Sequence, residues 1–334
     1  MVAGLGSSNL TAQWVQHWAS NPGQQLLFDD RSGWLSAGEF EERTRRVAGR
    51  YRAAGLAGGD RLLLSAPSSV DLAVAYVAAL RLGLVVVPVN TAYQEREVAH
   101  VVADASPAAA VVHDRDQAAW VAAASARSIP VFGPEVDLLD GPADDLDEAA
   151  ADDPAVLLYT SGTTGPAKGA PLSHRNLLAS AEAVGMAWQW TPEDRLVLAL
   201  PLFHLHGLGV GLVGTLTAGA SVVLQPAFRL NDLLDAVDRH RASLFFGVPT
   251  MYARLAASPR LAELDRLRLC VSGSAPLPVD LHLAIAEGAG QRVLERYGMT
   301  ETVMNVSNPY VGERRPGTVG FPLPGVELRL DPDT

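Results

Sequence analysis

The amino-acid sequence predicts an α/β fold with largely parallel sheets. Along its 334 residues, stretches with helical periodicity alternate with short apolar runs that are typical of buried strands. Hydrophobic residues make up 48% of the chain and charged residues 19%, a composition that suits a globular protein with two or three packed units. We find no repeat with a period of about 20 to 50 residues, so a solenoid or propeller is not expected.

The first third of the chain carries these signals in regular order. Ser36 is followed three residues later by Glu39, a capping-box spacing that predicts a helix over residues 36–54. A buried strand is expected next, then a helix and a second strand, and two shorter strands complete the same sheet. The expected ranges are 61–65, 70–82, 84–89, 110–113 and 130–132.

Three later segments have unusual compositions. Residues 135–153 hold nine acidic residues and no basic one, which predicts a solvated linker without function, because like charges repel and stay hydrated. Residues 205–224 carry no charged side chain, but their five glycines and His206 argue against a membrane-spanning helix. We expect a buried helix and then a strand there. Residues 325–330 are expected to be strand-like.

Charge and cysteine content disfavour several classes of protein. Lys and Arg total 26 against 37 Asp and Glu, and the net charge of −11 argues against binding to nucleic acids or to an anionic membrane surface. Cys270 is the only cysteine, so no internal disulfide can form and the thiol is expected in the core. The first 25 residues show no secretory signal, and we expect a cytoplasmic location.

The strongest motif is YTSGTTGPAKG, residues 159–169, directly after an apolar strand expected at residues 155–158. Its glycines permit backbone conformations that other residues avoid, its hydroxyls can donate hydrogen bonds, and Lys168 adds a mobile positive charge. Such a loop can surround a polyphosphate. It is not a Walker sequence, because Lys168 is followed by Gly169 rather than Ser or Thr. The alternative is a Gly-rich turn without function.

Two further motifs follow, SGSAP at residues 272–276 after an expected strand and YGMTET at residues 297–302. With these three motifs the sequence resembles the adenylate-forming superfamily of acyl-CoA synthetases, luciferases and peptide-synthetase adenylation domains over essentially its whole length. The resemblance implies the large N-terminal domain of that fold, with two stacked αβαβα subdomains interleaved within residues 1–308 and the start of a β-barrel subdomain at residues 309–334. It also implies that the small C-terminal domain, with the hinge, a ribose-binding aspartate and a catalytic lysine, is absent.

The same resemblance assigns residues to ATP and Mg²⁺. Phosphate contacts would come from Thr160, Ser161, Gly162, Thr163, Thr164, Gly165 and Lys168, and from Thr300 at the α phosphate. Adenine would be bordered by Gly273, Ser274, Ala275, Pro276 and Tyr297, and Gly298 and Met299 would also belong to the nucleotide site. Glu301 and Thr164 would hold Mg²⁺, a hard cation that prefers oxygen ligands. Taken alone, Glu301 is more often a solvated carboxylate and Tyr297 a core aromatic.

The implied reaction is attack of a carboxylate on the α phosphorus of ATP, which gives an acyl-adenylate and pyrophosphate before coenzyme A accepts the acyl group. No enzyme nucleophile is needed, in agreement with the lack of a Ser/His/Asp or Cys/His constellation in the sequence. Catalysis would rest on positioning and charge neutralisation, with Lys168, Thr300 and Glu301 as the catalytic residues.

Four stretches resemble the malonyl-CoA synthetase branch: WQW at 188–190, PLFHLHGL at 201–208, FGVPTMYARLA at 246–256 and ERYGMTETVMN at 295–305. In that branch a His, two Arg and a Ser hold the second carboxylate of the substrate. The matching residues are His206, Arg254, Arg296 and Ser274, and Met304 would border the α-carbon. Burying the charge of a dicarboxylate would cost several kcal/mol unless guanidinium groups pair with it.

Each of these residues also has a structural alternative. Arg254 could be a solvated helix residue, Arg296 could form an ion pair with Glu295, and His204 and His206 lack the further ligands of a zinc site. The expected function is therefore ATP-dependent ligation of malonate or methylmalonate to coenzyme A. The alternatives are another small acid with a different acceptor, or a non-catalytic nucleotide-binding module.

Overall fold

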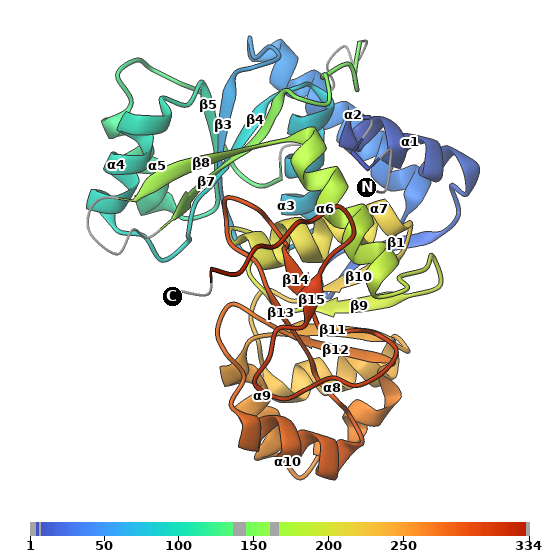
Figure 1. Ribbon diagram of the computed structural model, residues 1–334. Helices are drawn as coiled ribbons and strands as arrows, with labels where there is room; N and C mark the ends of the chain where they lie inside the picture. Colours follow the sequence, from blue (N-terminus) through green and yellow to red (C-terminus); the bar gives the residue numbers. More distant parts are fainter. Residues whose placement is uncertain (1–4, 7, 136–144, 161–166, 332–334) are drawn as a thin grey trace.

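The computed structural model describes residues 5–6, 8–135, 145–160 and 167–331, and its strands form two mixed sheets (Figure 1). Each sheet is parallel in its centre and has an antiparallel edge. The first sheet has the strand order β6 (Val131–Phe132), β5 (Ala109–Val112), β3 (Arg61–Ser65), β4 (Val85–Pro88), β7 (Pro154–Thr160), β8 (Lys168–Ser173). The second has the order β15 (Phe321–Pro322), β14 (Val306–Ser307), β13 (Leu294–Tyr297), β12 (Leu269–Ser272), β11 (Leu244–Gly247), β9 (Arg195–Leu198), β10 (Ser221–Leu224), β1 (Gln25–Asp29), β2 (Gly33–Ser36).

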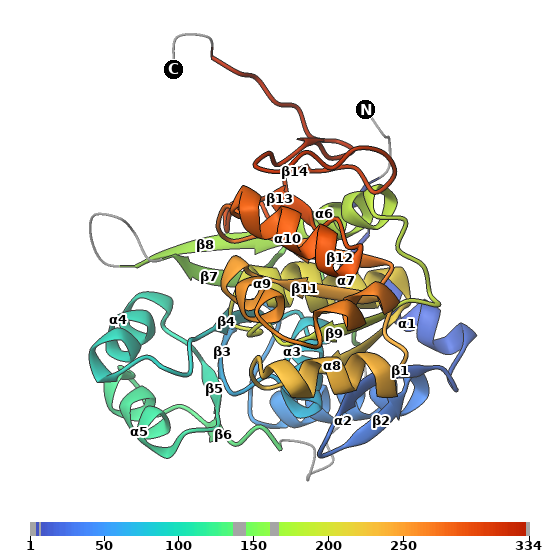
Figure 2. The same ribbon diagram turned by 90° about the horizontal axis from the view of Figure 1, so that it is seen from below.

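Helices cover both outer faces of this pair of sheets and fill the space between them, so the layers run helix, sheet, helix, sheet, helix (Figures 1 and 2). The outer face of the first sheet carries α4 (Glu95–Ala105) and α5 (Arg115–Ala124). The outer face of the second carries α8 (Leu230–Arg239), α9 (Pro249–Ala256) and α10 (Val279–Ala289), with the short η3 (Leu261–Arg266) beside them. The central layer holds α1 (Leu10–Ser20), α2 (Ala37–Ala53), α3 (Val70–Arg81), α6 (His174–Ala187) and α7 (Val213–Ala218).

Helix α3 shows why this arrangement suits the sequence. All of its residues are buried, and it contacts β3 and β4 of the first sheet and β1 of the second. A helix that is apolar all round is stable only when it is covered on every side. Its last residue, Arg81, is buried because Glu41 and Asp147 pair with its guanidinium. Among the described residues, the largest hydrophobic cluster therefore lies between the two sheets, and smaller ones lie under the outer helices.

Most of the elements expected from the sequence are present. The capping box at α2 is confirmed, with the Ser36 amide donating to Glu39 Oε2 at 2.8 Å. Residues 205–224 form η2 (His206–Leu212), α7 and β10, which confirms a buried helix followed by a strand. Cys270 is fully buried, as expected. In the described part of the chain, no helix is long and apolar enough to cross a membrane.

Two expectations about local structure are wrong. Residues 325–330 form no strand, since the chain finds no neighbouring strand there and Leu330 is 79% exposed. The expected solvated linker also fails at Asp147, whose carboxylate bonds Arg81 and whose carbonyl accepts a 2.7 Å hydrogen bond from Asn9. Residues 136–144 of the expected linker lie outside the described residues.

Candidate active site

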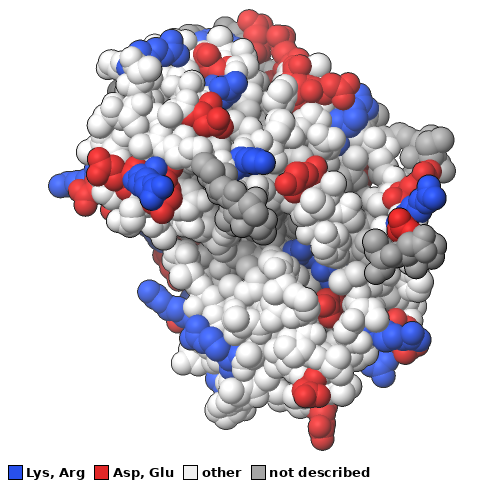
Figure 3. Space-filling model, turned by 60° about the vertical axis from the view of Figure 1, so that its left-hand side comes forward, with Lys and Arg blue, Asp and Glu red and all other residues white. Residues whose placement is uncertain are grey.

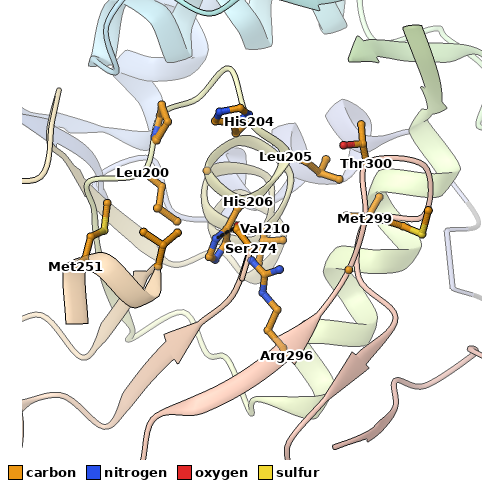
Figure 4. Close-up of a pocket in the computed structure, with 15 residues that line it drawn as sticks. Leu200, His204, Leu205, His206, Val210, Met251, Ser274, Arg296, Met299 and Thr300 are labelled. Atoms are coloured by element: carbon orange, nitrogen blue, oxygen red, sulfur yellow. Dashed lines mark hydrogen bonds between the residues drawn. The ribbon is translucent and has the colours of Figure 1, made fainter. Parts of the chain in front are cut away.

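A pocket of about 430 Å³ lies where four neighbouring parallel strands end, and ligands of open α/β sheets commonly bind at such carboxyl ends (Figure 4). The strands are β9, β11, β12 and β13. The polar side chains on the pocket wall belong to His204, His206, Ser274, Arg296 and Thr300. The apolar part of the wall includes Leu200, Leu205, Val210, Val248 and Met251.

Arg296 is the charged group of this pocket. It stands on β13 with only 6% of its surface exposed, and its guanidinium lies beside His206 and Ser274 in Figure 4. Its Nε and Nη2 atoms are buried and have no hydrogen-bond partner among the described residues. Burial lowers the pKa of Arg296 to about 10, so the side chain stays charged at neutral pH. A buried cation with free donors is costly unless an anion joins it.

The alternative pairing of Arg296 with Glu295 is not present. Successive residues of a strand point to opposite faces of the sheet. The Glu295 side chain accepts a hydrogen bond from the Leu277 amide at 3.1 Å, and burial raises the pKa of its carboxyl. Arg296 is therefore available to a ligand rather than committed to its neighbour.

His206 and Ser274 form a polar pair next to Arg296. His206 Nδ1 and Ser274 Oγ lie 3.3 Å apart, and His206 Nε2 is buried without a partner among the described residues. Burial, then the charge of Arg296 and then His204 hold the pKa of His206 well below its usual value of 6.5. His206 is thus a neutral donor or acceptor. Ser274 has a φ of +69°, in the left-handed region that side chains other than glycine seldom adopt.

The turn after β13 carries the residues assigned to the nucleotide. Gly298, Met299 and Thr300 line the pocket with Ser274, so the structure brings the SGSAP and YGMTET motifs together. Tyr297 is 50% exposed and Met299 43%, and of the two Met299 lines the pocket. Ala275, Pro276 and Glu301 are exposed as well.

Lys168 lies at the first residue of β8, exposed and paired with Thr160 at the last residue of β7. The segment between them includes Ser161, Gly162, Thr163, Thr164 and Gly165, which lie outside the described residues. On the face shown in Figure 3, basic and acidic side chains are interspersed without a broad region of one sign.

Two expected substrate residues are not on the pocket wall. Arg254 is exposed on α9, with its guanidinium 5.1 Å from the ring centre of Phe228. Met304 is 2% exposed, and its neighbour Val303 lines the pocket instead. The sequence reasoning missed Met251, which lies one helical turn before Arg254 and does reach the pocket. No local signal marks Met251, because the rotation of α9 depends on packing against distant residues.

The residues present fit a magnesium–nucleotide complex better than a metal site made by the protein alone. No group of three His, Cys, Asp or Glu in the described ranges could hold a metal ion. Mg²⁺ at nucleotide sites usually takes one or two carboxylates and completes its shell with phosphates and water. Glu301, exposed in the turn beside Thr300, can supply such a carboxylate.

The fold and this site define an α/β protein with a pocket at the carboxyl ends of its parallel strands, and comparison with known proteins identifies the family. Residues 15–334 match the family described as AMP-binding enzyme, and the chain belongs to that family. The resemblance to adenylate-forming enzymes is therefore confirmed, together with the α/β fold class.

Relatives within the family include several CoA ligases. The chain is 36% identical over 302 residues to feruloyl-CoA synthase from Amycolatopsis sp, covering 89% of this chain and 61% of the relative. It is 33% identical over 316 residues to malonate–CoA ligase of Arabidopsis thaliana, covering 85% and 52%. The crystal structure of ATP-bound MatB from Rhodopseudomonas palustris superimposes with a TM-score of 0.88 at 39% identity, covering 95% of this chain and 65% of MatB. The chain thus spans about half to two thirds of the length of these relatives.

Proposed function

We propose that this chain is the nucleotide- and acid-binding part of an acid–CoA ligase that activates malonate or methylmalonate with ATP. The observation that carries the proposal is Arg296, a buried guanidinium with two unpartnered nitrogens on the wall of a pocket. Neutral His206 and the Ser274 hydroxyl stand next to it. Together they can receive one small anionic group.

A dicarboxylic acid suits this arrangement because it carries a second charge that survives activation of the first carboxylate. Its distal carboxylate would accept charge-assisted hydrogen bonds from Arg296, which are stronger than those between neutral groups. The opposite carboxylate would then lie toward Thr300, in the turn assigned to the α phosphate. Arg296 would thus bind the acid and fix which end reacts.

We take the nucleotide roles of the remaining residues from the motif resemblance. Tyr297, whose side chain is 50% exposed, would stack on adenine beside residues 274–276, and Thr300 on the pocket wall would contact the α phosphate. Lys168 would neutralise charge on the β and γ phosphates. Mg²⁺, held by Glu301 and Thr164, would supply further neutralisation of the polyphosphate. The names of the relatives support coenzyme A as the acceptor, and we place the reaction in the cytoplasm.

The relatives also include an enzyme named for ferulate, so an aromatic monocarboxylic acid needs to be weighed. Such an acid would leave the charge of Arg296 buried and unpaired, at a cost of several kcal/mol. Activation of another small acid with a different acceptor, and a nucleotide-binding module without catalysis, remain the alternatives that experiment must separate.

Isothermal titration of the 334-residue chain with Mg²⁺ and AMP, and then with a panel of acids, tests the proposal. We expect AMP to bind, and malonate and methylmalonate to bind more tightly than propionate or ferulate. Tighter binding of ferulate would contradict the dicarboxylate assignment. Failure of AMP to bind at millimolar concentration would contradict the nucleotide site itself.

A further inference from the structure

The position of the Arg296 guanidinium is set by shape rather than by hydrogen bonds at its Nε and Nη2 atoms. Those two atoms have no partner in the described part of the chain. The guanidinium instead lies directly against the backbone of Gly273. A Cβ atom placed on Gly273 would stand 2.2 Å from Arg296 Cζ and 2.4 Å from its Nε, well inside contact distance.

The sheet register explains this contact. Strands β12 and β13 are parallel neighbours, and Ser272 pairs with Glu295. One residue further along each strand, Gly273 and Arg296 meet at the edge of the pocket. The missing side chain of Gly273 leaves the space that the guanidinium occupies. The following residue, Ser274, then turns toward His206 with its left-handed φ.

We infer that Gly273 is a positioning residue for acid recognition, because it alone leaves room for Arg296 to present its guanidinium to the pocket. This inference rests on the proposed function and adds a residue that acts through Arg296. It differs from the role that the motif resemblance implies for Gly273, which is contact with adenine. The two roles predict the loss of different ligands.

Replacement of Gly273 by alanine should change the position of the Arg296 guanidinium without changing the stability of the fold. The φ of Gly273 lies outside the left-handed region, so the backbone accepts a side chain at this residue. The new methyl group would meet the end of a flexible side chain, whose displacement is easier than that of backbone. We therefore expect Gly273→Ala to fold normally while Arg296 moves from its place on the pocket wall.

Gly288→Ala is the matched control. Gly288 lies on α10, away from the pocket, and a Cβ there would stand 2.5 Å from Leu261 Cδ2. The clash is of the same kind, again with the end of a flexible side chain. This variant should bind both ligands like the unchanged chain.

The test measures malonate and AMP affinity of the 334-residue chain by calorimetry for Gly273→Ala and Gly288→Ala. For Gly273→Ala we expect malonate affinity to fall at least about tenfold while AMP affinity changes less than about twofold. Loss of AMP affinity with malonate affinity retained would overturn the inference in favour of the adenine role. If Gly273→Ala binds malonate as tightly as Gly288→Ala does, the inference is overturned as well.

A crystal structure of Gly273→Ala decides the steric claim independently of any ligand. A displaced guanidinium supports the inference, and a guanidinium in its original place overturns it. If the unchanged chain binds no malonate, the proposed function fails, and the crystal structure still settles whether Gly273 positions Arg296.

Discussion

At the residue scale, the site combines a charged side chain, Arg296, and a neutral one, His206, and the pKa of each is lower than usual. Arg296 is buried with a pKa lowered to about 10, and its charge contributes to keeping the neighbouring His206 neutral. Burial alone disfavours the charged form of both groups. Because only Arg296 remains charged near neutral pH, it must supply the electrostatic attraction for an acidic ligand. His206 and Ser274 then contribute direction through hydrogen bonds.

This assignment predicts a flat pH profile for acid binding. The pKa of His206 in the folded protein lies below its usual value of 6.5, so the imidazole remains neutral as the pH falls to that value. Arg296 stays protonated up to about pH 10. Malonate affinity, measured by calorimetry between about pH 6.5 and 8.5, should therefore change less than about twofold. A rise in affinity on acidification that disappears in His206→Gln would show that His206 titrates, contrary to this account.

At the element scale, the WQW motif has a structural role that the sequence alone did not indicate. Trp188 ends α6, and its Nε1 donates a 2.8 Å hydrogen bond to Ser307 Oγ on β14. Ser307 is paired across the sheet with Arg296. The bond therefore fixes the strand next to the one that carries the charged residue of the pocket. Trp190 packs against the same ring of Phe246 but leaves its buried Nε1 without a partner among the described residues.

The two tryptophans form a matched pair for mutation. Trp188→Phe removes a bonded donor, whereas Trp190→Phe removes a donor that has no partner in the described ranges. The loss of a buried hydrogen bond costs about 1 kcal/mol, and the smaller ring leaves similar space in both variants. We expect urea unfolding to show a free energy lower by about 1 kcal/mol or more for Trp188→Phe than for Trp190→Phe. Equal losses in the two variants would mean that the bond to Ser307 contributes nothing.

Comparison of the expected elements with the structure shows which elements a sequence can predict. The strand Arg61–Ser65 and the start of α2 were correctly placed, because their signals are local: an apolar run and a capping box. The strand expected at residues 325–330 is absent because a strand needs a neighbouring strand to pair with. The residue pattern of a segment does not show whether such a neighbour is present. Short-range patterns thus predicted individual elements but not their pairing.

The candidate site likewise contains residues whose position the sequence predicts and residues whose position it does not. Arg296 and Arg254 both match the motif pattern, yet only Arg296 faces the pocket. Arg254 lies on the exposed side of α9 over Phe228, while Met251 on the same helix points inward. Residues at strand ends were predictable because their position in the sheet fixes their direction. The rotation of a helix depends on packing against distant residues, which no local motif encodes.

At the scale of the whole molecule, the chain interleaves its two sheets. Strand β1, near the N-terminus, pairs in parallel with β10, so the second sheet includes residues from both ends of the described chain. Helix α3 contacts both sheets. The division into residues 1–308 and a barrel segment from residue 309 stays a prediction, although β15 extends the second sheet by an antiparallel strand.

The central claim is that the charge of Arg296 selects a dicarboxylic acid, and the structure supplies Arg254→Met as the matched control for Arg296→Met. Both variants remove a guanidinium, but only Arg296 is buried on the pocket wall. The decisive measurement is the ratio of malonate to propionate affinity in the two variants and the unchanged chain. We expect Arg296→Met to weaken malonate binding by about 2 to 5 kcal/mol and to affect propionate far less. Arg254→Met should leave the ratio unchanged, whereas an unchanged ratio in Arg296→Met would contradict the account.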